Sequence, residues 1–218
     1  MKKRLIIALS LLVLLSTFKP QNLFLSNKFT IKEINIENNF ILKEEIIIKK
    51  LAFLYEINLI YLNTFDIEKI FNNVDFIESF EIKKIYPDKL KIKIYEKKPI
   101  AILQNKKKKF YLSENFEFIN YSDLDSFKNL PLVFGNKKDF KKLYTDLKKI
   151  NFPLILISKY YLYESKRWDI ETFKKNIIKL PPKNYIKSLE NFLSLKKTNN
   201  FDKYKIFDYR INNQLILK

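Results

Sequence analysis

Alternating apolar and polar residues predict a β-hairpin near the middle of the chain. Leu90, Ile92 and Ile94 alternate with lysines, so a strand here would carry aliphatic side chains on one face and lysines on the other. A similar alternating run precedes it around Phe80. The segment Tyr86–Lys89 between the two runs contains a proline, which fixes φ and removes a backbone donor, so it predicts the turn. The hairpin has one apolar face, and neighbouring elements must cover it.

The segments before the hairpin predict those covering elements. Residues 29–37 favour a strand with isoleucines on one side. In Leu42–Leu54 the apolar residues recur at helical spacing, and Thr64 is expected to cap a second, short helix. The predicted order of strand, helix, helix, strand, strand is typical of a small α+β domain.

Beyond Pro99 the pattern predicts a second, β-rich domain. Short strands are expected around Phe110 and at 116–119, and a long strand over Pro153–Tyr163 is expected to form a hairpin with Trp168–Glu171. The same reasoning predicts amphipathic helices over 139–150 and 184–195, and strands over 177–180, 205–209 and 215–217. The predicted fold class is therefore α+β, with a mostly antiparallel β domain that carries two helices.

The N-terminus predicts an export signal. A basic start, Lys2-Lys3-Arg4, precedes the run Leu5–Phe18, which has no charge. A helix of that length rises about 21 Å, short of the roughly 30 Å hydrocarbon core, but the segment can extend to Leu25. No pair of small residues stands at the spacing of a cleavage site. We therefore predict an uncleaved transmembrane anchor that spans residues 5–25 and follows a cytoplasmic N-terminus of residues 1–4. A signal peptide that is removed is the less favoured alternative.

Composition excludes several kinds of chemistry. The 218 residues include no Cys and no His, so disulfides, thiolate nucleophiles, a histidine base and the commonest metal ligand are all missing. We expect no catalytic, cofactor-binding or metal site, although chemistry that uses carboxylates alone stays open. The net charge of +18 favours polyanionic partners. However, the lysines mostly stand opposite aliphatic residues, and Lys106–Lys109 lacks interleaved aromatic residues, so a solvated surface is expected and nucleic-acid binding is not.

Several other polar or aromatic residues have structural interpretations. Asp125 and Asp139 stand where aspartate normally serves turns and helix caps. Trp168 is expected to lie in a strand with its side chain buried in the hydrophobic core. Asp208 and Arg210 would share one face of a strand, which predicts a structural ion pair.

The stretch Ile77–Ala101, IESFEIKKIYPDKLKIKIYEKKPIA, resembles the POTRA domain and its exit in the bacterial FtsQ/DivIB cell-division family. The glycines usual in the family's first strand-to-helix turn and after Trp168 are replaced by Asn38-Asn39 and Thr172-Phe173. Asparagine tolerates left-handed turns. Later segments continue the resemblance over nearly the whole chain: Asn129–Gly135 (NLPLVFG), Arg167–Ile170 (RWDI) and Ile206–Arg210 (IFDYR).

The resemblance implies a non-enzymatic divisome scaffold. It implies a POTRA-like domain over residues 29–97 and a partner-binding β-rich domain over 98–218. The protein would be a single-pass inner-membrane protein at the septum, with its N-terminus in the cytoplasm and its bulk in the periplasm. It would bind FtsB and FtsL (the FtsQBL complex) and other division proteins, link early and late components and regulate septal peptidoglycan synthesis, without a small-molecule substrate.

The resemblance also implies where partners bind. A partner strand would add to the last strand of the second domain by β-augmentation. The residues implied are Tyr209, Arg210, Ile211, Asn212, Asn213, Gln214, Leu215 and Ile216.

Two other functions stay open on the sequence. One is a secreted carboxylate-dependent hydrolase that acts on the cell wall, although a chain with one glycine offers few places for close substrate approach. The other is a polyanion-binding or outer-membrane assembly module, which the POTRA-like part alone would permit.

Overall fold

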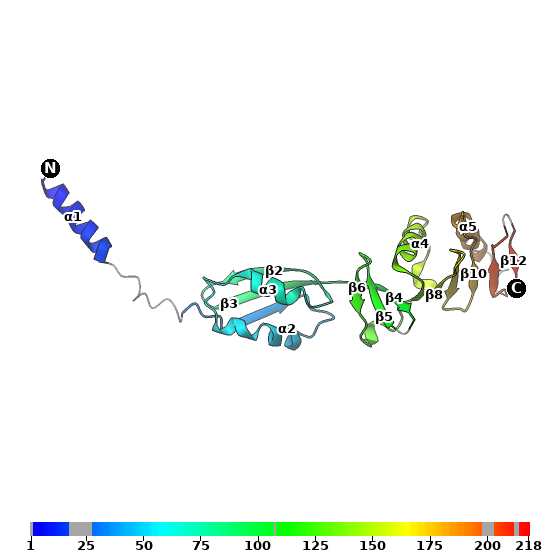
Figure 1. The fold of residues 1–218 in the computed structure, drawn as a ribbon, viewed down its shortest axis with the longest axis horizontal. Coiled ribbons are helices and arrows are strands. Elements are labelled where there is room, and N and C mark those ends of the chain that lie inside the picture. Colours follow the sequence, from blue (N-terminus) through cyan, green and yellow to red (C-terminus); the bar gives the residue numbers. More distant parts are fainter. Residues whose placement is uncertain (1, 18–27, 107, 198–202, 212–213) are drawn as a thin grey trace. The chain divides into compact units, whose positions relative to one another are not determined.

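The structure is a computed structural model that describes residues 2–17, 28–106, 108–197, 203–211 and 214–218 (Figure 1). The chain divides after Glu96 into two compact units, residues 1–96 and 97–218. We call them unit 1 and unit 2 and describe each by itself.

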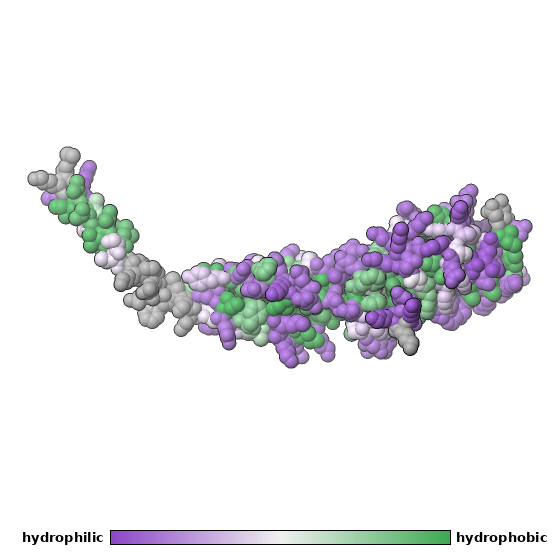
Figure 2. Space-filling model, in the orientation of Figure 1, coloured by the Kyte–Doolittle hydropathy of each residue, from purple (hydrophilic) through white to green (hydrophobic). Residues whose placement is uncertain are grey.

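Helix α1 spans Lys2–Thr17, and hydrophobic residues cover it in Figure 2. None of the helices in the described ranges combines the length and the hydrophobicity that a membrane crossing requires. Residues 18–25, which complete the predicted anchor, lie outside the described part of the chain.

A three-stranded sheet organises unit 1. Strand β3 (Lys89–Glu96) lies between β2 (Ile77–Ile85), its antiparallel hairpin partner, and β1 (Glu33–Glu37), which runs parallel to it. The hairpin predicted from alternation is confirmed. Leu90, Ile92 and Ile94 are fully buried, because the helices of the unit cover this face of the sheet (Figure 1).

Helix α2 is shorter than the periodicity predicts. Helix α2 spans Glu44–Lys50, and a 3₁₀ turn follows it at Ala52–Glu56. The tighter turn brings Leu54 into the core, whereas Ile46, expected on the buried side, is about half exposed. Helix α3 spans Thr64–Phe71, and its cap is Asn63 rather than Thr64, since the Asn63 side chain accepts the N–H of Phe65.

One of the two glycine replacements acts as predicted. Asn38, in the turn after β1, adopts a left-handed φ of 64°. In the second turn the left-handed residue is Lys175, with φ of 64°, rather than Thr172 or Phe173.

The Glu96 side chain binds the backbone of the loop that leads into α2. One carboxylate oxygen accepts the backbone N–H groups of Phe40 (3.0 Å) and Ile41 (2.8 Å), and the other accepts that of Leu42 (2.8 Å). The last residue of β3 thus holds a loop more than fifty positions earlier in the chain. Hydrogen bonds to a charged acceptor are stronger than neutral ones.

We expect Glu96→Ala to lower the free energy of unfolding of unit 1 by about 2–4 kcal/mol, because three backbone donors lose a charged acceptor. Urea denaturation measures the change. The matched control is Glu33→Ala, which removes an exposed ion pair to Lys89 and should cost under about 1 kcal/mol. Equal losses in the two variants would show that the Glu96 bonds contribute no more than a surface pair.

Unit 2 is built on one large sheet. Within the described residues the sheet has nine strands, in the order β12-β11-β10-β9-β8-β7-β4-β5-β6. The strands are β4 (Pro99–Asn105), β5 (Lys108–Ser113), β6 (Phe118–Asn120), β7 (Leu132–Phe134), β8 (Ile157–Leu162), β9 (Trp168–Thr172), β10 (Ile177–Lys179), β11 (Ile206–Asp208) and β12 (Ile216–Leu217). The helices are α4 (Lys137–Lys149) and α5 (Tyr185–Lys196), with 3₁₀ turns at Asp125–Phe127 and Leu154–Leu156.

The sheet is more mixed than the predicted antiparallel domain. β4 with β7, β7 with β8, and β10 with β11 are parallel pairs. Parallel neighbours need a crossover connection, and α4 and α5 supply two of them, from β7 to β8 and from β10 to β11. The long strand predicted over 153–163 begins with a 3₁₀ turn, so its regular part is only β8.

Helices α4 and α5 cover the same face of the sheet, and the core lies between the helices and the sheet (Figure 1). Trp168 is buried in this core as predicted. A Cβ atom on Gly135 would lie 3.0 Å from both the Trp168 ring and Leu162 Cβ, so the absence of a side chain allows this close approach. One row of buried side chains crosses the sheet from β7 to β11: Val133, Tyr160, Ile170, Ile178 and Phe207.

Candidate partner-binding site

Strand β12 forms one edge of the sheet in unit 2. It pairs antiparallel with β11, with Leu217 opposite Phe207 and Ile216 opposite Asp208. The N–H of Lys218 donates to the Ile206 carbonyl (3.1 Å), and a Lys218 oxygen accepts the N–H of Ile206 (2.9 Å). Since hydrogen-bonded and non-hydrogen-bonded pairs alternate, Leu217 forms a non-hydrogen-bonded pair. Its N–H and C=O therefore face away from β11.

Side chains near this edge divide between the two faces of the sheet. Leu215 and Leu217 pack against the core of unit 2, whereas Ile216 lies on the opposite face and is 39% exposed. Ile211 is also exposed. The N–H of Gln214 donates to the Ile211 carbonyl (3.2 Å), so it serves the turn rather than the sheet edge.

The structure gives the other predicted residues different places. Tyr209 is buried, and its hydroxyl donates to the Asn191 side chain (2.9 Å) on α5. Arg210 contacts the Asp208 carboxylate through Nε and Nη2. Asn212 and Asn213 lie outside the described residues.

A polar cavity of about 410 Å³ lies between α5 and the segment after β11. Ile211, Gln214 and Leu215 line one side of it. Lys187 and Asn191, one helical turn apart on α5, line the other, together with Lys183 before the helix. Sequence reasoning missed these helix residues. Their spacing marks an exposed helix face, but nothing local shows that it lies beside the end of the chain.

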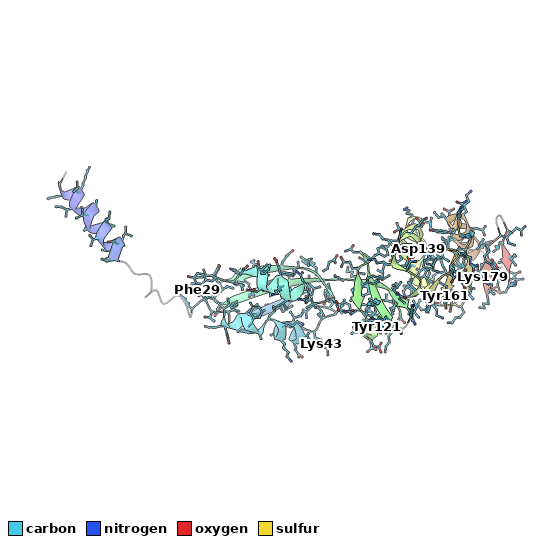
Figure 3. The ribbon with its side chains drawn as sticks, in the orientation of Figure 1. Phe29, Lys43, Tyr121, Asp139, Tyr161 and Lys179 are labelled. Carbon is cyan, nitrogen blue, oxygen red and sulfur yellow. The ribbon has the colours of Figure 1, made fainter. Side chains whose placement is uncertain are left out.

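A row of charged residues crosses the other face of the sheet beside this edge. Asp169 on β9, Lys179 on β10 and Asp208 on β11 are register partners, and Tyr161 on β8 continues the row (Figure 3 labels Tyr161 and Lys179). Both carboxylates are buried. Lys179 thus stands opposite both carboxylates in the register, and its positive charge attracts each of them.

Two arginines pair with these carboxylates. Arg210 lies 2.6 Å from Asp208, which confirms the predicted ion pair, and Arg167 lies 3.2 Å from Asp169. Hydrogen bonds from Arg210 hold the pKa of Asp208 below its ordinary value. Burial raises the pKa of Asp169, although Arg167 opposes this change. The pKa values of these two neighbouring carboxyl groups are therefore shifted in opposite directions.

The pKa of Asp208 gives a testable pH dependence. A carboxyl whose pKa is lower in the folded protein stabilises the fold above its unfolded pKa of about 3.9, and the effect is lost as pH falls through the folded pKa. We expect Asp208→Asn to lower stability at pH 7 and to flatten the acid limb of stability against pH, as measured by urea denaturation. Asp125→Asn, which alters an exposed pair with Lys128, is the control. Superimposable profiles for Asp208→Asn and the parent would contradict this role.

The remaining predicted charged groups serve the fold or its surface. Asp139 accepts a hydrogen bond from the capping residue Asn136 (2.8 Å) and pairs with Lys166 (2.8 Å) at the start of α4. Lys108 and Lys109, expected in a loop, begin β5 instead. Among the residues that the structure describes, no group of three or more acidic side chains could hold a metal ion.

Comparisons with known proteins find a matching family model and several similar proteins. A family model described as "POTRA domain, FtsQ-type" matches residues 29–97. "Cell division protein FtsQ" of Methylomonas methanica is 25% identical over 131 residues, which cover 58% of this chain and 51% of that protein. "Cell division protein FtsQ" of Rickettsia bellii is 26% identical over 194 residues, 87% of this chain and 72% of that protein.

A third relative carries the other name of the family. "Cell division protein DivIB" of Clostridium tetani is 30% identical over 115 residues, 51% of this chain and 43% of that protein. The matched regions thus span between 43% and 72% of these relatives' own lengths. Residues 29–97 thus match an FtsQ-type POTRA domain, and the similarity of the chain to FtsQ and DivIB proteins over half or more of its length supports the FtsQ/DivIB family of bacterial cell-division proteins.

Proposed function

We propose that this protein is a non-enzymatic scaffold of the divisome, which binds other division proteins through the free edge of β12. The observation that carries the proposal is the register of β12, which turns the N–H and C=O of Leu217 away from β11. An edge strand with unpaired backbone groups is a template for a partner strand. The relatives are named as cell-division proteins, which supports the same role.

The proposed partners are FtsB and FtsL. A partner strand would add to β12 through its backbone, while Ile216 and the exposed Ile211 add apolar contact. The polar cavity beside the edge would accept a second part of the partner, and Lys183 and Lys187 at its rim favour an acidic residue there. Main-chain bonds would supply affinity, and the side chains around them would supply specificity.

The proposed location is the inner membrane at the septum. The basic start and the apolar residues of α1 support an anchor over residues 5–25, with the N-terminus in the cytoplasm and both units in the periplasm. In that position the protein would join early and late division proteins and regulate septal peptidoglycan synthesis. Residues 29–97 and 98–218 are the proposed functional domains.

Comparing Leu217→Pro with Leu217→Ala tests the backbone contact. Both variants lose the leucine side chain from the core, so we expect similar losses of stability. Only proline removes the outward N–H, so it should weaken binding to a purified FtsB–FtsL pair about tenfold more than alanine does. The measurement is the Kd of each variant by titration calorimetry, beside its Tm. Equal Kd values for the two variants would argue against augmentation at β12.

A further inference from the structure

The chain enters the sheet of unit 1 at one end and leaves it at the other. Strands β1 and β3 are parallel neighbours, so the start of β1 and the end of β3 lie at opposite ends of the sheet. The N–H of Leu59 donates to the Phe29 carbonyl (2.8 Å), and that of Ile31 donates to the Ile57 carbonyl (3.1 Å). The loop before α3 therefore lies beside the residues that lead into β1. Phe29 lies at this end of the sheet, and Lys43 lies near the other (Figure 3).

The turn between β2 and β3 belongs to the same end. The rings of Phe29 and Tyr86 meet edge to face, with their centroids 6.2 Å apart. From β2, the Lys84 ammonium donates to the Leu62 carbonyl (3.1 Å), so this turn and the loop before α3 are held side by side. We call this end of the sheet the N-terminal tip, and it comprises Phe29, Ile60, Tyr61, Ile85 and Tyr86.

Large side chains of the N-terminal tip are exposed. Tyr61 is 81% exposed, Tyr86 57%, Ile60 42% and Ile85 40%. Phe65, in the first turn of α3, follows the same loop and is 62% exposed. A single exposed apolar residue is ordinary on a protein surface, but a group of them on two adjoining loops forms an apolar surface that a partner can cover.

Charged side chains around the N-terminal tip pair with one another or with the backbone. Lys32 lies 3.5 Å from Asp88, and Lys89 lies 2.7 Å from Glu33. The Lys84 ammonium is taken up by carbonyls of the loop before α3. The tip thus offers aromatic and aliphatic contact rather than a concentration of charge. Tyrosine, which has an apolar ring and a polar end, is enriched where hydrocarbon meets water, as at membrane interfaces.

The sequence keeps this tip close to the proposed anchor. Phe29 is four residues beyond Leu25, where the anchor over residues 5–25 ends. Four residues reach at most about 14 Å, and the headgroup region of one leaflet is itself about 5–8 Å deep. A chain anchored in this way cannot carry the tip far from the lipid surface. Because the tether maintains a high local concentration of lipid, a weak contact is enough for docking.

We propose that the N-terminal tip docks on the membrane interface beside the anchor, with Tyr61 and Tyr86 among the headgroups and Ile60 and Ile85 against the acyl boundary. This inference rests on the proposed anchor. Burial of these exposed side chains stabilises the contact, and the paired charges leave no large cost of desolvation. The end of β3, at the opposite end of the sheet, then faces away from the lipid.

The test places the full chain in phosphatidylcholine vesicles that contain a lipid with brominated acyl chains, which quenches nearby tryptophan emission. We expect the indole of Tyr61→Trp to lose about half or more of its emission, because an interfacial side chain lies about 5–10 Å into the headgroup–acyl boundary. Phe40→Trp is the matched control. Phe40 is 89% exposed, but its N–H donates to Glu96 at the end of β3, so its emission should not change. The buried Trp168 is common to all variants, and the parent supplies its background.

Two further measurements show whether apolar contact holds the tip. Adding Tyr61→Asp to Tyr86→Trp should lower the quenching of the new indole to about a third or less, since a charged side chain disfavours the interface. The Tm should stay near that of the parent, because Tyr61 is 81% exposed. Quenching of Tyr61→Trp should be the same in about 0.1 M and 1 M NaCl.

Flotation of the vesicles separates this inference from the anchor on which it rests. If the chain floats with the vesicles but Tyr61→Trp and Phe40→Trp are quenched equally, the docking of the tip is overturned and the anchor stands. Quenching that high salt removes would also overturn it, in favour of attraction between the basic chain and the lipid. A chain that does not float overturns both the anchor and the docking.

Discussion

Ile92→Asp should unfold unit 1 and leave unit 2 folded. Ile92 is fully buried at the centre of β3, where it faces Ile36 on β1 and Ile82 on β2. Burying a carboxyl group there without a partner costs several kcal/mol. Domains are stable by about 5–15 kcal/mol, and a unit this small is expected near the lower end. This one substitution should therefore remove most of the free energy of unfolding of unit 1.

Limited proteolysis with mass spectrometry distinguishes the two units. In the variant, new cleavages should appear within residues 33–96, while β8 and β9 of unit 2 stay protected. Lys91→Asp is the matched control, because Lys91 is the neighbouring position on the opposite face and pairs with the partly exposed Glu37. It should cost little. If β3 of Ile92→Asp resisted protease as the parent does, the buried face of the hairpin would be wrongly assigned.

Deleting residues 212–218 should abolish partner binding while unit 2 stays folded. The deletion removes β12 and hence the whole template for the added strand. Strand β11 keeps its parallel pairing with β10 and the Asp208–Arg210 ion pair. The loss of Leu215 and Leu217 from the edge of the core should cost about 2–3 kcal/mol.

Affinity for the FtsB–FtsL pair should fall at least about a hundredfold, which corresponds to several lost backbone bonds. Lys108→Glu at the start of β5 is the control, and its binding should change only in its salt dependence. Near-ultraviolet circular dichroism checks that the core around Trp168 is intact. A truncated chain that bound as tightly as the parent would place the interface elsewhere, and unit 1 would be the next surface to test.

The sequence predicts unit 1 better than unit 2, and the reason is physical. The β2–β3 hairpin is local, so its alternation and its turn can be recognised in one short stretch. Strand β7 has three residues, and both of its neighbours, β4 and β8, are parallel partners that are distant in the chain. Parallel pairing has no local signal, because its crossover connection separates the paired strands.

The candidate site shows the same limit. The family resemblance indicates the segment after β11, but it includes Tyr209, whose ring serves the core and whose hydroxyl bonds to α5. Which backbone groups point outward depends on the pairing of Lys218 with Ile206. Lys218 lies two residues beyond Ile216, where the predicted segment ends. Lys187 lines the polar cavity only because tertiary packing brings α5 beside the end of the chain.

The topology of unit 1 has a mechanical consequence. Its first strand, β1, and its last, β3, are parallel neighbours, so tension applied to the two ends of the unit pulls them in opposite directions along their length. The load then shears the register from Glu33–Lys89 to Glu37–Lys93 as a whole, instead of opening one rung at a time. Ion pairs of 2.7 Å from Lys89 to Glu33 and from Lys91 to Glu37 cross the same boundary. Under such a load the β1–β3 pair would therefore have to break its rungs together.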